Sequence, residues 1–152
     1  MPKKKPPGRL LAVNRRARHD YHLLERFEAG IALTGTEVKA AREGRVQLKD
    51  SYIEIRDGEA YLQRAHISPY SHGDRNSHAP ERPRKLLLKR REIDKIFGRT
   101  TIQGQTCVPL AAYLKGNLIK LEIALAKGKK LYDKRQEARA RVLDEEAREA
   151  IG

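Results

Sequence analysis

Regular alternation of apolar residues with other residues is the feature that most limits how this 152-residue chain can fold. Near residue 120 single residues separate four apolar side chains, namely Ile119, Leu121, Ile123 and Leu125. A period of two places such side chains on one face of a β-strand. A similar alternation over residues 21–33 predicts a second long strand, in which Gly30 suggests a bulge or a kink.

Two further regions predict strands with recognisable turns. Residues 51–67 predict a hairpin, because isoleucines alternate with charged residues and Asp57-Gly58 supplies the positive φ angles of a two-residue turn. Residues 106–114 predict another strand, and Pro109 within it favours an edge position because proline cannot donate to a neighbouring strand. The chain therefore carries at least four segments of strand character.

Short helices are expected between these strands. Thr34 and Glu37 fit a capping box, which predicts a helix that ends at Gly44. Residues 86–97 predict a second helix that ends at Gly98. Together the elements predict a mainly β fold with flanking helices, and we expect a small β-barrel of the oligonucleotide-binding type.

The positive charge of the chain is concentrated in three segments. The sequence has 33 Lys and Arg residues against 20 Asp and Glu residues, a net charge of +13. Residues 1–18, 82–99 and 127–141 hold 22 of the basic residues and only 4 of the acidic ones. Clustering of this kind favours a polyanionic partner, with nucleic acid before an anionic membrane.

These patterns divide the chain into three parts. Residues 1–13 are expected to be a flexible basic arm, residues 14–126 an RNA-binding β-barrel domain with a long surface loop at 68–83, and residues 127–152 a basic C-terminal tail. The tail is rich in helix-forming Ala, Arg, Glu and Lys but has few apolar residues. We therefore expect it to be disordered alone and helical when bound to a partner. An inert extension and a helix packed on the barrel are the alternatives.

The sequence offers little for catalysis or for a metal ion. Cys107 is the only cysteine, and the five histidines fall in no ligand pattern. No phosphate-binding glycine loop or nucleophile motif is present. No signal-like or membrane-spanning apolar run occurs. We expect a cytoplasmic binding protein that is not an enzyme and has no cofactor or metal.

Six segments, in order along the chain, resemble the small protein B (SmpB) family. They are Asn14–Ala17, Tyr21 with Phe27–Ile31, Thr34–Lys39, Asp50–Tyr52, Arg84–Leu88, and Ala126–Lys130 with Asp133–Arg135. The resemblance implies an oligonucleotide-binding-type barrel that binds the tRNA-like domain of transfer-messenger RNA (tmRNA). It also implies delivery of that RNA to stalled ribosomes for trans-translation, with the tail in the empty mRNA channel.

The resemblance also implies particular contacts and partners. RNA-binding residues of the body are expected to be Asn14, Arg15, Arg16, Glu28, Leu87, Lys89 and Arg90. Ribosome-contacting residues of the tail are expected to be Lys127, Lys129, Lys130, Tyr132, Lys134 and Arg135. The expected partners are tmRNA and the ribosome with its decoding centre, mRNA channel and ribosomal RNA. Elongation factor Tu and alanyl-tRNA synthetase are expected as indirect partners through tmRNA, and we expect a monomer with no membrane partner.

Three other interpretations remain open at the level of sequence. A general RNA-binding, ribosomal or nucleoid protein acting by charge would discriminate little between RNAs. A membrane-surface protein would form its tail helix on anionic vesicles. An enzyme with an unrecognised site would lose activity through one substitution without losing binding.

Overall fold

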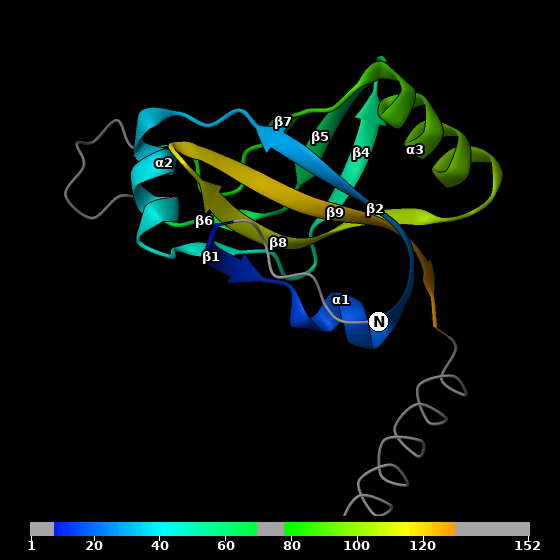
Figure 1. Ribbon diagram of the computed structural model, residues 1–152, viewed down its shortest axis with the longest axis horizontal. Coiled ribbons are helices and arrows are strands. Elements are labelled where there is room, and N and C mark those ends of the chain that lie inside the picture. The colour runs from blue at the N-terminus through cyan, green and yellow to red at the C-terminus, as the bar shows by residue number, and fades with distance from the viewer. Residues whose placement is uncertain (1–7, 70–77, 130–152) are drawn as a thin grey trace, which may run out of the picture.

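The computed structural model describes residues 8–69 and 78–129, which form a curved antiparallel sheet with three helices around it (Figure 1). The strands are β1 (Arg9–Val13), β2 (Tyr21–Ile31), β3 (Val46–Gln47), β4 (Tyr52–Arg56), β5 (Glu59–Gln63), β6 (His66–Ile67), β7 (Arg84–Leu87), β8 (Thr106–Lys115) and β9 (Leu118–Gly128). The helices are α1 (Arg15–Asp20), α2 (Gly35–Arg42) and α3 (Arg90–Ile102). Figure 1 shows α2 and α3 at opposite ends of the curved sheet. The expectation of a mainly β fold with flanking helices is confirmed.

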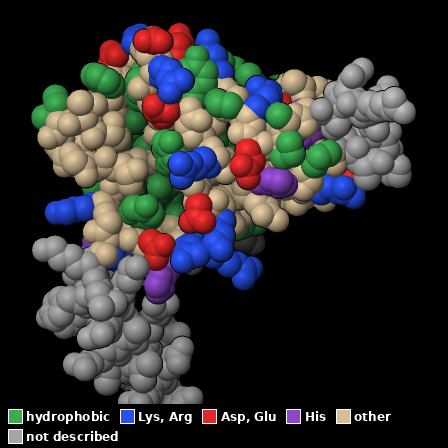
Figure 2. Space-filling model, turned by 180° about the vertical axis from the view of Figure 1, so that it is seen from behind, with side chains coloured by type: hydrophobic (Ala, Val, Ile, Leu, Met, Phe, Trp, Pro, Cys, Tyr) green, Lys and Arg blue, Asp and Glu red, His purple; other side chains and the backbone are tan. Residues whose placement is uncertain are grey.

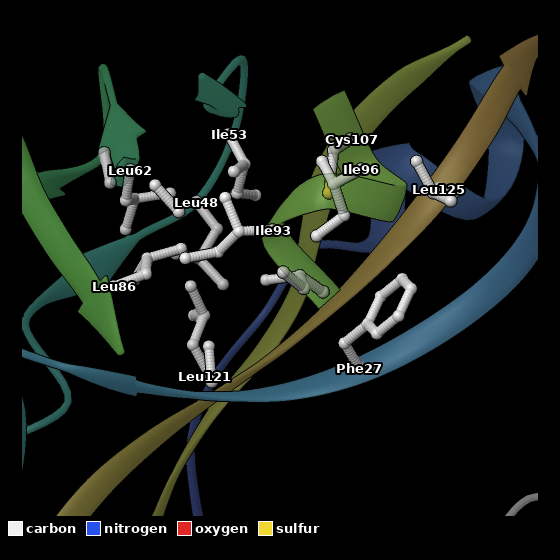
Figure 3. Packing of buried hydrophobic residues seen from close by; sticks show 14 of the residues in the cluster. Phe27, Leu48, Ile53, Leu62, Leu86, Ile93, Ile96, Cys107, Leu121 and Leu125 are labelled. Atoms are coloured by element: carbon white, nitrogen blue, oxygen red, sulfur yellow. The ribbon is translucent and has the colours of Figure 1, made fainter. Parts of the chain in front are cut away.

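Seven strands form one sheet in the order β1-β8-β9-β2-β7-β5-β4, and β3 pairs with β6 separately. The sheet curls so far that β4, at one edge, contacts β8 near the other edge. The concave side of this partly closed barrel holds the hydrophobic core (Figure 3). The alternating apolar residues of β9 are buried as predicted, and Ile93 and Ile96 of α3 complete the core beside them.

Local turn and capping signals predicted several elements correctly. Asp57 and Gly58 join β4 to β5 with φ angles of 51° and 76°. Thr34 caps α2: its hydroxyl accepts from the backbone N–H of Glu37, whose carboxylate accepts from the backbone N–H of Thr34. The strand predicted over residues 106–114 is present as β8, but the edge position inferred from Pro109 is wrong, because β8 pairs with both β1 and β9 and Pro109 is accommodated at a bulge.

The predicted helix over residues 86–97 is wrong at both ends. Arg84–Leu87 form β7, because Arg84 and Leu86 point into the core while the residues between and after them are exposed. The helix begins later, at Arg90, and continues through Gly98 to Ile102. A glycine inside a helix costs only about 1 kcal/mol relative to alanine, which the packing of Ile93 and Ile96 offsets.

The region before β2 is more ordered than the sequence predicted. Residues 9–13, expected to belong to the basic arm, form β1, which pairs with residues 111–114 of β8. Residues 15–20, for which the sequence predicted no helix, form α1, whose N-cap is Asn14. The bulge of β2 lies between Leu23 and Glu25 rather than at Gly30.

A buried ion pair fixes the start of β7. The side chains of Arg84 and Glu37 are both 0% exposed, and the Arg84 Nε lies 2.7 Å from Glu37 Oε2. Arg82 binds the other carboxylate oxygen of Glu37, and Arg84 also donates to the carbonyls of Ala65 and Pro80. Burial raises the pKa of Glu37, but the hydrogen bonds from Arg82, the Thr34 backbone and Arg84 outweigh burial and leave that pKa below its ordinary value. The carboxylate therefore stays ionised inside the protein.

Cys107 is a core residue, and its thiol should resist alkylation. The side chain is 0% exposed in β8, and burial raises its pKa to about 12. Because only the thiolate reacts, native protein at pH 8 should show no modification by iodoacetamide in the time that fully modifies urea-unfolded protein. Mass spectrometry measures both rates, and equal rates would contradict this buried placement.

Candidate RNA-binding groove

The outer surface of the sheet has a groove where β2 passes between β9 and β7. On this strand Gly30 is opposite Lys120 of β9 on one side and Leu87 of β7 on the other. The groove is lined by Glu28, Gly30, Glu59, Lys85, Leu86, Leu87, Leu88, Lys89, Glu92, Ile93 and Lys120. Three of the expected RNA-binding residues, Glu28, Leu87 and Lys89, are thus together in one place.

Leu87 forms an apolar floor in this groove. Leu87 is 58% exposed. Gly30 makes room for it, because a Cβ on Gly30 would lie only 3.2 Å from the Leu87 Cβ. The exposed apolar surface at the centre of the groove therefore depends on a glycine in the neighbouring strand.

The side chain of Glu28 on β2 is held by two residues of β8, the strand on the far side of β9. The hydroxyl of Tyr113 donates to Glu28 Oε2, and the Nζ of Lys115 lies 3.4 Å from Oε1. The Tyr113 hydrogen bond lowers the pKa of Glu28 most, burial opposes it, and Lys115 lowers it further. Burial and the neighbouring Glu28 raise the pKa of Tyr113, so its phenol stays protonated. The pair is therefore a fixed donor beside an ionised acceptor.

The charged residues around the floor include several that the sequence did not single out. Lys85 and Lys120 come from β7 and β9, whereas only Lys89 was expected. They could be identified only from the pairing of the strands, which brings residues distant in the sequence together. Lys89 is exposed before α3, and its backbone N–H donates to Glu92 at 2.9 Å. Three lysines and three glutamates of the groove lining thus surround one apolar side chain: Lys85, Lys89, Lys120, Glu28, Glu59 and Glu92.

Arg90 has a structural contact of its own. Its guanidinium donates to the carbonyl of Gly58 at 2.9 Å and lies 3.4 Å from Asp94. It thereby connects the first turn of α3 to the β4–β5 hairpin. Its side chain is 63% exposed, so the same group can also face a ligand.

The remaining expected residues of the body lie at the other end of β2, beside α1. Asn14 is 7% exposed, and its amide donates to the carbonyls of Leu48 and Pro109 while its oxygen caps α1. These bonds give Asn14 a structural role. Arg15 is exposed, and Arg16 lies 3.5 Å from Asp20.

The start of the tail lies beside α1, near Arg15 and Arg16. Lys127 is opposite His22 in the β2–β9 ladder. The backbone N–H of Lys129 donates to the Asp20 carbonyl at 2.9 Å, and its Nζ donates to the Arg18 carbonyl at 3.1 Å. The other expected tail contacts lie outside the described residues: Lys130, Tyr132, Lys134 and Arg135.

The expected site residues thus form two groups and not one surface. Gly128 pairs with Tyr21 at the first residue of β2, and Leu87 pairs with Gly30 near its last. Nine residues of extended chain separate these positions, which corresponds to roughly 30 Å along the strand. A single short contact could not involve both groups.

The described surface mixes charges of both signs. Figure 2 shows Lys and Arg side chains interspersed with Asp and Glu side chains on the face turned away in Figure 1. Many basic residues also have acidic partners, such as Lys95 with Glu25 at 2.8 Å and Arg26 with Glu122 at 3.1 Å. Within residues 8–69 and 78–129, no three His, Cys, Asp or Glu side chains come together as a metal site, and no helix is long and apolar enough to cross a membrane.

Comparisons with known proteins agree with one another. The family model described as SmpB protein matches residues 11–152. A protein of Carboxydothermus hydrogenoformans named SsrA-binding protein is 54% identical over 143 residues, covering 94% of this chain and 96% of that protein. A protein of the same name from Halothermothrix orenii is 52% identical, with coverages of 94% and 92%. A chain from the solved structure "tmRNA-SmpB: a journey to the center of the bacterial ribosome" has a TM-score of 0.68 and 43% identity, covering 84% of this chain and 94% of that chain.

Proposed function

The chain belongs to the SmpB protein family, and from this membership we propose that it binds tmRNA, the SsrA RNA, and acts with it in trans-translation. In this role the protein delivers tmRNA to ribosomes that have stalled. The β2–β7–β9 groove binds the tRNA-like domain of that RNA. The groove itself supports the proposal, because an exposed leucine floor beside three lysines suits an unpaired nucleotide and its phosphates.

The composition of the groove argues against binding by charge alone. A surface made only for phosphates has no need of an ionised carboxylate at its centre, since Glu28 repels phosphate groups. It also has no need of an exposed leucine. Both features suit recognition of bases or sugars, which carry the differences between one folded RNA and another.

The second group of basic residues supports a separate contact with the ribosome. Arg15, Arg16, Lys127 and Lys129 lie roughly 30 Å from the groove along β2. A protein that binds one RNA through the groove therefore still has a basic surface for ribosomal RNA. We place the decoding centre at this surface and the tail, which continues from it, in the empty mRNA channel.

Several finer features complete the proposal. The protein acts as a cytoplasmic monomer that binds and does not catalyse, without cofactor or metal. Elongation factor Tu and alanyl-tRNA synthetase reach the complex through tmRNA. The buried Asn14 is left out of the RNA contacts, while Lys130, Tyr132, Lys134 and Arg135 remain proposed contacts of the tail.

Binding selectivity tests the proposal directly. At physiological salt the protein should bind a tRNA-like fragment of tmRNA at least tenfold more tightly than an ordinary tRNA of equal length, as measured by fluorescence anisotropy. Leu87→Ala should reduce that preference about tenfold, because the leucine surface that the RNA covers is lost. Leu24→Ala is the matched control, since Leu24 is a similarly exposed leucine of β2, 53% against 58%. Equal and steeply salt-dependent binding to both RNAs would instead indicate a general RNA-binding protein.

A further inference from the structure

The chain enters the sheet at a fixed place, where β1 lies beside the last residues of β8 (Figure 1). Arg9, the first residue of β1, is opposite Leu114. Gly8 lies so close to β8 that a Cβ on it would be only 1.8 Å from the carbonyl oxygen of Leu114. A side chain at this position would displace the end of the strand. Residues 1–7, the N-terminal segment, lie outside the described residues and therefore join the sheet beside the end of β8.

This place is on the outer face of the sheet. Leu10 of β1 is opposite Tyr113 of β8, whose hydroxyl donates to Glu28 on the outer face. Residues directly opposite in an antiparallel sheet point to the same face, and Leu10 is accordingly 48% exposed. Four strand spacings separate β1 from β7 in the order β1-β8-β9-β2-β7, which corresponds to about 19 Å. The N-terminal segment thus begins on the same face as Leu87, four strands away.

The outer face between β1 and the groove carries exposed apolar side chains. Leu118 of β9 is 62% exposed and is opposite Lys115 of β8. Lys115 is two residues from Tyr113 and so shares the outer face with it. The Nζ of Lys115 lies 3.4 Å from Glu28, whose negative charge offsets its own. An RNA strand that extends from the groove toward β1 would therefore cover Leu10 and Leu118 and find little positive charge for its phosphates.

The N-terminal segment contains the positive charge that this surface lacks. Lys3, Lys4 and Lys5 follow one another, and residues 1–7 include no acidic residue. An extended chain spans at most about 3.5 Å per residue, so Lys3 can lie up to about 17 Å from Gly8 before its side chain is counted. The three ammonium groups can therefore reach phosphates between β1 and the groove.

We propose that the N-terminal segment binds the phosphate backbone of the RNA that occupies the groove, where this RNA extends over Leu10 and Leu118 toward β1. The inference rests on the proposed function and adds a separate electrostatic contact to it. Lysine binds phosphate as a point charge, and phosphates carry no sequence information, so the segment raises affinity without contributing to selection. Gly8 and the pairing of β1 with β8 hold the start of the segment at the edge of this RNA.

The salt dependence of binding tests the charge contact. A triple variant of the full chain, Lys3→Gln with Lys4→Gln and Lys5→Gln, is compared with the wild type in anisotropy titrations of the tRNA-like fragment at several salt concentrations. Each neutralised phosphate contributes about 0.7–0.9 to the slope of log K against log salt, so the slope should become shallower by about 2. Affinity at physiological salt should fall about tenfold, with the preference over ordinary tRNA unchanged. The triple Lys→Arg variant is the matched control, and it should bind as the wild type does.

Tethered cleavage of the RNA tests the position of the segment. Cys107 is the only cysteine and is buried, so Lys4→Cys supplies one accessible thiol for an iron chelate that generates hydroxyl radicals. Leu118→Cys is the near marker on the outer face, and Leu24→Cys is the far marker. Leu24, at the bulge of β2, lies near Ala126, roughly 26 Å along β9 from Leu118. Fragment nucleotides cleaved from position 4 should include or adjoin those cleaved from position 118, and not those cleaved from position 24.

The outcomes separate this inference from the proposed function. If the wild type prefers the fragment but the triple Lys→Gln variant keeps the wild-type salt slope, the inference is overturned and the proposed function stands. The same holds if cleavage from position 4 is absent or matches the pattern from position 24, because the segment then lies away from the groove. If the wild type has no preference for the fragment over ordinary tRNA, the proposed function fails, and this inference fails with it.

Discussion

Replacing Glu37 with glutamine should lower the free energy of unfolding by about 3–5 kcal/mol, because it leaves Arg84 as an uncompensated buried charge. Glutamine has nearly the same shape, so the change removes the charge and little packing. Arg84 is 0% exposed and cannot turn to water without breaking its bonds to the carbonyls of Ala65 and Pro80. Urea denaturation followed by circular dichroism measures the difference in unfolding free energy between the two proteins.

Glu43→Gln is a suitable control, since Glu43 follows α2 and lies 3.1 Å from Arg45 in an exposed ion pair. Exposed pairs of this kind contribute between 0 and about 1 kcal/mol, so this variant should be nearly as stable as the wild type. Equal losses in the two variants would contradict a special role of the buried pair.

The pH dependence of stability gives an independent check on Glu37. Its pKa is lower in the folded protein than the unfolded value of 4.5, so its ionised form stabilises the fold at neutral pH. That contribution is fully present above pH 4.5 and is lost as the pH falls through the folded pKa. The stability difference between the wild type and Glu37→Gln should therefore shrink in acid. A difference that stays constant down to the folded pKa would mean that ionisation is not its cause.

The elements that the sequence predicted well all depend on neighbours in the chain. The alternation in β9, the Asp57-Gly58 turn and the capping box of Thr34 and Glu37 are local signals, and local signals decide such elements. β7 shows the limit of such local signals. A short apolar run such as 86–88 fits a buried helix or a buried strand equally well by period. What decides in favour of a strand is Arg84, whose partner Glu37 lies 47 residues away.

The functional groove was predictable only in part for the same reason. Glu28, Leu87 and Lys89 were expected from the family resemblance, and the structure brings these three together. Tyr113 and Lys120 were not expected, because nothing near them in the sequence distinguishes them from other residues of their strands. Their place is set by the register of four strands and by a bulge in β8 between Pro109 and Ala111. Asn14, also expected from the resemblance, lies outside the groove as a buried cap of α1, which its sequence neighbours did not predict.

Replacing Ala138 with proline should abolish ribosome rescue while leaving tmRNA binding within about twofold of the wild type. Residue 138 lies outside the described residues, and the prediction follows from the proposal that the tail becomes a helix in the empty mRNA channel. Proline inside a helix costs about 3 kcal/mol, enough to prevent a helix that forms only on its partner. The groove should be unaffected, because β9 ends beside α1, roughly 30 Å along β2 from Leu87.

Tagging of nascent chains in a reconstituted translation system with a stalled message measures rescue, and anisotropy with the tRNA-like fragment measures binding. Ala138→Ser is the control, since serine changes the side chain slightly and keeps the helical backbone available. If the helix forms only in the channel, the free-energy cost of ordering the tail is offset only on ribosomes that lack messenger RNA. The tail would therefore distinguish an empty channel from an occupied one. Normal rescue by Ala138→Pro would show that the tail acts without a helix at this position. Loss of tmRNA binding in the same variant would instead show that the tail belongs to the groove's own contact with RNA.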